Sequence, residues 1–162
     1  MALEYSLLLE DHVLSKDTIL DELNKLGYSC EKIECLQLGF TIYDTYEKAG
    51  FSLSLLDTSC MAFGYEFEYL PDPFMDKQDL CFRINKFYDW EHAINNMLTI
   101  IFNLLAKVQG SAIFECNGET IHLLRRNGVL YINEDTGFWK NEKFLRFVNQ
   151  FEYEILKAPN QQ

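Results

Sequence analysis

Two Asn-Gly pairs, ten residues apart, constrain the fold of this chain more than any other feature of its sequence. Asn117-Gly118 and Asn127-Gly128 each separate two apolar-rich runs. Both central residues of a type I′ turn need φ > 0, which Asn and Gly tolerate best. We therefore predict a three-stranded antiparallel meander with strands at about Ser111–Cys116, Glu119–Arg126 and Val129–Asn133.

The two turns also predict a register. With two-residue loops, Phe114 would face Ile121 and Leu123 would face Ile132. One face of the meander would then be almost wholly apolar, with Ala112, Phe114, Cys116, Ile121, Leu123, Leu130 and Ile132. The other face would be mixed, with Ile113, Glu115, His122, Leu124, Tyr131 and Asn133. Because a one-residue slip would scramble this sorting, we expect the apolar face to lie on a core.

The strongest helical pattern is Trp90–Gln109, which follows Asp89 as a potential N-cap. Its apolar side chains recur at helical spacing and cover more than half of its surface, so we expect it at the centre of the core. Shorter helices are predicted at Lys16–Leu26, with Ser15 as N-cap, and at Asn141–Phe151.

Alternating or β-rich runs predict strands elsewhere. These runs are Ala2–Glu10, Tyr28–Leu38, Phe40–Tyr46, Phe51–Leu56, Ala62–Leu70 and Asp79–Phe87. The first should pair inside a sheet, and Tyr153–Leu156 either forms a last strand or continues the last helix. The order β-α-β-β-β-β-β-α-β-β-β-α lacks alternating β-α-β units. We therefore predict an α+β fold with a mainly antiparallel sheet and a long central helix. A single globular domain should span residues 1–157, followed by a flexible tail at 158–162.

Composition and charge exclude several kinds of partner. Apolar residues at 48% and aromatic residues at 15% indicate a packed globule. The formal net charge is 14 − 25 = −11, which argues against binding to nucleic acid or to an anionic membrane surface. The acidity serves solubility, or it steers the chain toward a basic protein partner. The five cysteines lack C-x-x-C spacing, and the N-terminus has no basic leader. We therefore expect reduced thiols and a cytoplasmic protein.

Three patterns could carry chemistry, and each has a structural alternative. Asp135-Thr136-Gly137 matches the tripeptide of aspartic proteases, but that chemistry needs two carboxylates and the chain has one copy. His12, His92 and His122 have no partner at metal-ligand spacing. A Cys116–His122 pair is disfavoured because the predicted register points them to opposite faces. We predict no catalytic residue, no metal and no cofactor.

The best candidate for a partner-binding surface is an acidic, aromatic stretch in the middle of the chain. Glu66 and Glu68 could form a glycosidase-like pair, but they are more simply the solvated face of a strand. An exposed Tyr69 beside such acids would suit a protein interface. We therefore predict partner binding by Glu66, Glu68, Tyr69, Asp72, Asp76 and Asp79.

Several segments resemble the swarming-inhibition (SitI-type) immunity proteins of bacterial toxin–immunity pairs. They are Asn117-Gly118-Glu119, Leu124-Arg125-Arg126-Asn127-Gly128 and the close Asn133-Glu134-Asp135-Thr136-Gly137-Phe138-Trp139, together with the opening Met1-Ala2-Leu3-Glu4-Tyr5. The resemblance implies a non-enzymatic inhibitor that protects the producing cell by binding a cognate toxin. A basic toxin would suit the net charge. Two alternatives stay open, namely an intracellular regulatory or adaptor module and a small hydrolase that uses Asp135 or His122.

Overall fold

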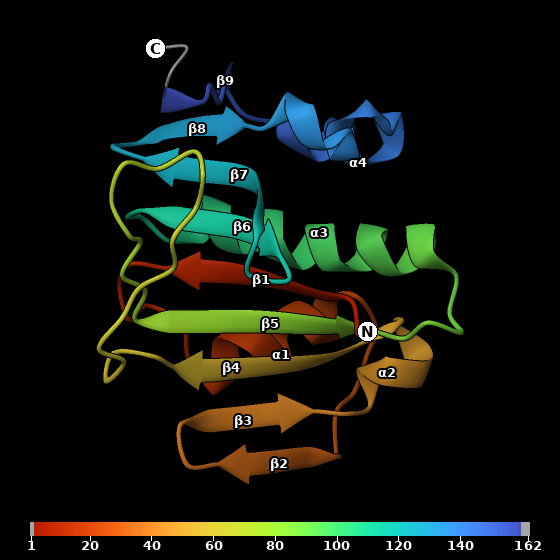
Figure 1. Cartoon of the computed structure of the whole chain (residues 1–162). Helices are drawn as coiled ribbons and strands as arrows, with labels where there is room; N and C mark the ends of the chain where they lie inside the picture. Colours follow the sequence, from red (N-terminus) through yellow and green to blue (C-terminus); the bar gives the residue numbers. More distant parts are fainter. Residues whose placement is uncertain (1, 160–162) are drawn as a thin grey trace.

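The computed structural model describes residues 2–159, which form one nine-stranded sheet (Figure 1). Its strands are β1 (Glu4–Leu9), β2 (Ile33–Leu36), β3 (Gly39–Ile42), β4 (Phe51–Asp57), β5 (Gln78–Ile84), β6 (Ala112–Cys116), β7 (Thr120–Arg126), β8 (Val129–Ile132) and β9 (Tyr153–Ile155). Their spatial order is β2-β3-β4-β5-β1-β6-β7-β8-β9. Only the β8–β9 pair is parallel in this described sheet. The predicted α+β class with a mainly antiparallel sheet is therefore confirmed.

Strand β1 lies in the middle of the sheet, as predicted for a strand that pairs on both sides. Leu7 pairs with Leu80 of β5 and with Phe114 of β6. Every residue from Tyr5 to Leu9 is buried. The N-terminal strand therefore joins the two halves of the sheet, which are far apart in the sequence.

The helices among the described residues are α1 (Lys16–Lys25), α2 (Thr45–Lys48), α3 (Trp90–Lys107) and α4 (Glu142–Val148). Both predicted N-caps are confirmed. The backbone N–H of Thr18 donates to Ser15 Oγ (3.2 Å), and that of His92 donates to Asp89 Oδ1 (2.7 Å). No helix within residues 2–159 has the length and apolar character needed to cross a bilayer.

The main core lies between one face of the sheet and helices α1, α3 and α4, with α1 and α3 behind the sheet in Figure 1. Helix α3 buries ten of its residues, as its nearly continuous apolar surface requires. In this core it packs with Leu7, Phe82 and Phe114 from three neighbouring strands. The buried carboxylate of Glu22 on α1 forms an ion pair with Lys107 at the end of α3. The prediction of a central helix is confirmed.

Both Asn-Gly pairs form turns with the predicted positive φ, but only the second is the predicted two-residue loop, because Cys116 pairs with Thr120 in the first hairpin. Asn117 and Asn127 both have φ of 53°, and the glycines that follow have φ of 74° and 76°. In the second hairpin Leu123 lies opposite Ile132, and Arg125 lies opposite Leu130. The predicted register of this hairpin is confirmed.

The predicted register of the first hairpin is wrong. Phe114 lies opposite Leu123 and Glu115 lies opposite Ile121, so His122 is an extra residue in a β-bulge. Ile121 therefore joins the face of the sheet away from the helices. His122 and Cys116 both lie beside Tyr5, so the prediction that they point to opposite faces is also wrong.

The predicted strand Ala62–Leu70 does not form. Residues 58–77 are instead a long crossing segment between β4 and β5, and they make only an isolated bridge between Tyr65 and Phe74. We call residues 58–77 the cover loop, because in Figure 1 they cross in front of β1, β6 and β7 on the face away from α3. Pro71 and Pro73 lack the N–H needed for strand pairing. The alternating aromatic side chains of this segment cover a sheet rather than extend it.

The C-terminal part also differs in detail. Helix α4 is shorter than the predicted Asn141–Phe151, and the strand alternative at Tyr153–Leu156 is confirmed by β9. Two 3₁₀ turns, Glu134–Thr136 and Phe138–Lys140, occupy the close of the meander. Of the predicted tail at 158–162, residues 160–162 lie outside the described residues. The single domain over residues 1–157 stays a prediction.

Candidate functional site

The inner side of the cover loop builds a second core on the sheet. Phe67, Leu70 and Phe74 are buried there. They pack against Leu8, Ile113, Ile121, Leu124 and Leu156 from the sheet and its C-terminal extension. The meander face that the sequence indicated as mixed is therefore also covered, and the cover loop is held in place by apolar burial.

Beneath the cover loop lies a buried acidic pair, Asp79 of β5 and Glu115 of β6. Their side chains flank Ser6 of the central strand and lie under Tyr65 of the cover loop. Burial raises the pKa of Asp79 to about 6 and that of Glu115 to about 7. The charge of Asp79 raises the pKa of Glu115 further, whereas a hydrogen bond from the backbone N–H of Gly118 opposes the shift. Asp79 Oδ1 is buried without a hydrogen-bond partner.

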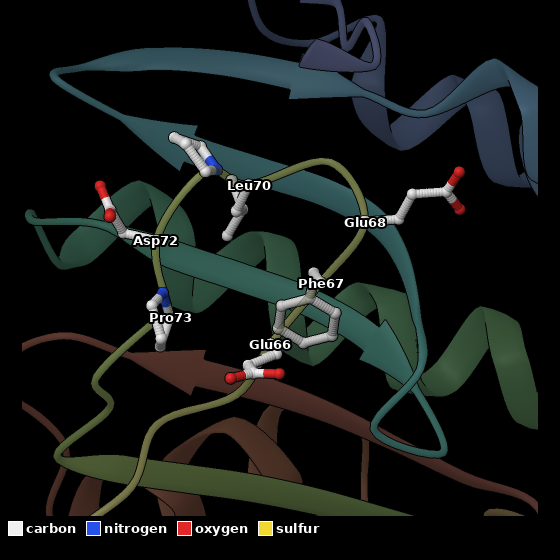
Figure 2. A pocket seen from close by; sticks show the side chains of 7 residues that line it. Glu66, Phe67, Glu68, Leu70, Asp72 and Pro73 are labelled. Atoms are coloured by element: carbon white, nitrogen blue, oxygen red, sulfur yellow. The ribbon is translucent and has the colours of Figure 1, made fainter. Parts of the chain in front are cut away.

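Three of the six predicted partner-binding residues lie on the outer surface of the cover loop. Glu66, Glu68 and Asp72 are exposed, and Figure 2 shows Glu68 and Asp72 projecting outward on opposite sides of the loop. Phe67 and Leu70 lie between them and point toward the sheet. A shallow pocket of about 360 Å³ is lined by Glu66, Phe67, Glu68, Leu70, Pro71, Asp72 and Pro73.

Tyr69 connects the cover loop to the end of the meander. Its hydroxyl donates a hydrogen bond of 2.6 Å to Asp135 Oδ2. This bond raises the pKa of the Tyr69 hydroxyl, because the phenolate would face a carboxylate. The acid of the protease-like tripeptide is therefore an exposed acceptor for a tyrosine.

The other two predicted acids do not reach the surface with the first three. Asp76 and Asp79 are each 9% exposed. Asp76 Oδ2 accepts a hydrogen bond of 2.6 Å from Thr58 Oγ1, which closes the base of the cover loop. The structure thus brings Glu66, Glu68, Tyr69 and Asp72 onto one loop and places Asp76 and Asp79 beneath it.

His122 lies in an aromatic cluster on the helix side of the sheet. Its ring stacks on Phe138 at 4.4 Å between centroids, and its Nδ1 lies 3.1 Å from Thr136 Oγ1. Burial lowers its pKa to about 4, so the ring is neutral near pH 7. Trp139 Nε1 donates to the carbonyl of His122 (2.7 Å), and Trp139 is 3% exposed. These contacts give His122 and Trp139 a structural role.

The other polar candidates have simple surroundings. Arg125 donates to the carbonyl oxygens of Leu105 (2.6 Å) and Gly110 (2.9 Å), so it binds the negative end of the α3 dipole. No group of three or more His, Cys, Asp or Glu side chains within residues 2–159 is arranged to hold a metal ion. All five cysteines are free.

The burial of Glu115 and the exposure of Phe63 were not predicted from the sequence. Glu115 is buried, and the signal for it was a lone acid between apolar strand residues. Phe63 lies within the predicted strand Ala62–Leu70, yet its side chain is 89% exposed. The adjoining Gly64 was the available signal, because it allows the chain to leave an extended course.

The model of the SitI3-like family matches residues 3–143. The chain belongs to the SitI3-like family. The match runs from β1 through the cover loop, α3 and the meander into the start of α4. It thus includes the acidic middle segment as well as the motifs that carry the resemblance. Neither the curated proteins nor the solved structures gave a match.

Proposed function

We propose that this protein is an immunity protein that binds and neutralises a cognate bacterial toxin in the cytoplasm, without catalysis of its own. The family match over residues 3–143 carries the proposal. The two residues on which a hydrolase would depend also favour it. His122 is buried among aromatic rings, and Asp135 is bound by the Tyr69 hydroxyl. Because its ring is buried, His122 is not presented to a substrate as a general base must be.

The toxin-binding surface in this proposal includes the outer side of the cover loop. Glu66, Glu68 and Asp72 supply exposed negative charge, and Tyr69 supplies an amphipathic ring beside them. Asp76 acts from beneath by holding the base of the loop through its hydrogen bond with Thr58. A net charge of −11 would speed association with a basic toxin and disfavour acidic partners.

Co-expression with the product of the adjoining gene tests this function. The expected result is that the neighbouring protein arrests growth alone and that co-expression of this chain restores growth. The two purified proteins should form a complex, whereas an unrelated toxin should neither be bound nor be neutralised. Absence of both protection and complex formation would overturn the proposal, and a complex without protection would favour an adaptor role.

A further inference from the structure

Large apolar side chains are exposed at the end of the sheet where the cover loop begins and ends. We call Leu38, Met61, Phe63 and Met75 the end patch. Their exposed fractions are 37%, 52%, 89% and 51%. An aromatic ring that is almost fully exposed contributes little to folding and lowers solubility. Groups of exposed apolar side chains are typical of interaction sites in folded proteins.

Backbone hydrogen bonds bring together the segments that carry the end patch. The N–H of Asp57 donates to the carbonyl of Leu38 (2.6 Å), and that of Met61 donates to the carbonyl of Thr58 (3.0 Å). Thr58 is in turn bonded to Lys77, at the far end of the cover loop (2.9 Å). The two ends of the loop and the β2–β3 turn therefore meet at one place.

The position of Gly64 brings Met75 close to Phe63. Tyr65 and Phe74 exchange two backbone hydrogen bonds, of 2.9 and 2.8 Å, so the segments on either side of the bridge run antiparallel. A side chain at Gly64 would lie 2.7 Å from Met75 Sδ and 2.4 Å from the carbonyl oxygen of Phe74. Met75 therefore crosses directly over the residue that follows Phe63. Because this backbone is already ordered, little conformational entropy is lost when its side chains bind a partner.

The segment that carries most of the end patch is strongly acidic. Residues 57–79 contain six acids and one lysine, which gives a formal charge of 1 − 6 = −5 within a chain of −11. Three of these acids, Glu66, Glu68 and Asp72, are exposed on the same loop. The loop that carries Met61, Phe63 and Met75 therefore also carries exposed negative charge, a combination that complements an apolar socket within a basic surface.

A second exposed phenylalanine provides a contrast within the same protein. Phe87 is 87% exposed and follows the end of β5 that lies away from the cover loop. The ammonium group of Lys86 lies 5.0 Å from its ring centroid. Arg83 and Lys86 line a neighbouring pocket of about 510 Å³. The Phe87 ring therefore already lies against a cation of its own chain, which does not suit contact with a basic partner.

We propose that the end patch, with Phe63 at its centre, is the anchor that inserts into an apolar socket on a basic face of the cognate toxin. This inference rests on the proposed function and names the chemistry of the partner. The apolar anchor supplies the slow dissociation of the complex. The acids of the cover loop supply the fast association.

Two matched variants, Phe63→Ser and Phe87→Ser, test the anchor. Both should leave the urea midpoint of unfolding unchanged, because neither ring is buried. The probe is the purified product of the adjoining gene, and its equilibrium affinity and rates are measured by surface plasmon resonance. We expect Phe63→Ser to weaken binding at least tenfold, mainly through faster dissociation, and Phe87→Ser to change it less than twofold. Met61→Ser should weaken binding in the same direction as Phe63→Ser, which guards against a local folding defect at a single position.

The outcomes separate this inference from the function on which it rests. If the wild-type chain binds and protects but Phe63→Ser and Met61→Ser do so equally well, the anchor is wrong and the function stands. A larger loss for Phe87→Ser would move the contact to the positive end of the sheet and overturn the anchor. If the wild-type chain neither binds nor protects, both proposals fail. An association rate that is independent of salt would overturn the basic character of the partner.

Discussion

Glu115→Gln should stabilise this protein, and the gain should grow as the pH rises. The pKa of Glu115 is raised from 4.5 to about 7, because the carboxyl group is buried beside Asp79. Between these two values the folded state binds more protons than the unfolded state, so stability falls as the pH increases. Glutamine stays neutral and keeps an oxygen that can accept the hydrogen bond from Gly118. The substitution therefore removes the cost of ionisation with little loss of contact.

The size of the effect follows from the two pKa values. A single titrating group with these values costs about 1.4 kcal/mol at pH 5.5 and about 3.4 kcal/mol at pH 8.5. The advantage of Glu115→Gln over wild type should therefore increase by about 2 kcal/mol across this range. The buried His122 affects the pH dependence of stability in the opposite direction, because its lowered pKa makes the folded state less stable in acid. That contribution is present in both proteins and cancels in the difference.

Urea denaturation followed by tryptophan fluorescence, at constant ionic strength from pH 5.5 to 8.5, measures this difference. Glu119→Gln is the matched control, since Glu119 is exposed in the neighbouring turn and its substitution should change stability little at any of these pH values. A difference between Glu115→Gln and wild type that stays constant with pH would refute the reasoning. A variant less stable than wild type at pH 8.5 would show that the carboxylate is solvated in the folded protein.

Three further substitutions test other parts of the structure. Trp139→Ala should destabilise the fold by about 3–5 kcal/mol in urea unfolding, because the ring is buried and its N–H is bonded; a loss below 1 kcal/mol would contradict a core position. Gly128→Ala should cost about 1–2 kcal/mol, because its φ is 76° and no neighbour lies within 4 Å to add a clash; equal stability would argue against the type I′ turn. Replacing Glu66, Glu68 and Asp72 together by lysine should slow association with the product of the adjoining gene at low salt while leaving the unfolding midpoint unchanged; an unchanged rate would exclude the cover loop from electrostatic steering.

The candidate site was predicted from the sequence only in part. The acidic stretch could be recognised in the sequence because its acids lie close together. Exposed acids carry no desolvation cost, so several can occur in one solvated segment. The sequence did not predict which acids lie on the outer side of the loop and which lie beneath it. Asp72 and Asp76 flank Pro73 in the same loop, yet Asp72 is exposed and Asp76 is buried. Which acid is buried depends on Thr58, which lies eighteen residues away and closes the loop.

An alternation of aromatic and other residues is compatible with a strand that pairs in a sheet and with a segment that packs on the face of a sheet. The cover loop is of the second kind. Phe63, Tyr65, Phe67 and Tyr69 alternate as in a strand, but β5 and β6 already occupy both edges of β1. The segment therefore packs on the face of the sheet, where Phe67 contributes to the second core and Phe63 is left outside. No local pattern distinguishes these outcomes, because the choice depends on which strand edges are free.

The sequence by itself determined the features whose causes are local. Asn127 and Gly128 form the second turn because few other residues accept positive φ, and Ser15 and Asp89 begin their helices because their oxygens reach free N–H groups. The tertiary structure alone decided the bulge at His122, whose carbonyl accepts hydrogen bonds from both Asn133 and Trp139. It alone also decided the burial of Glu115 and the exposure of Phe63, because burial depends on segments brought together from distant parts of the chain.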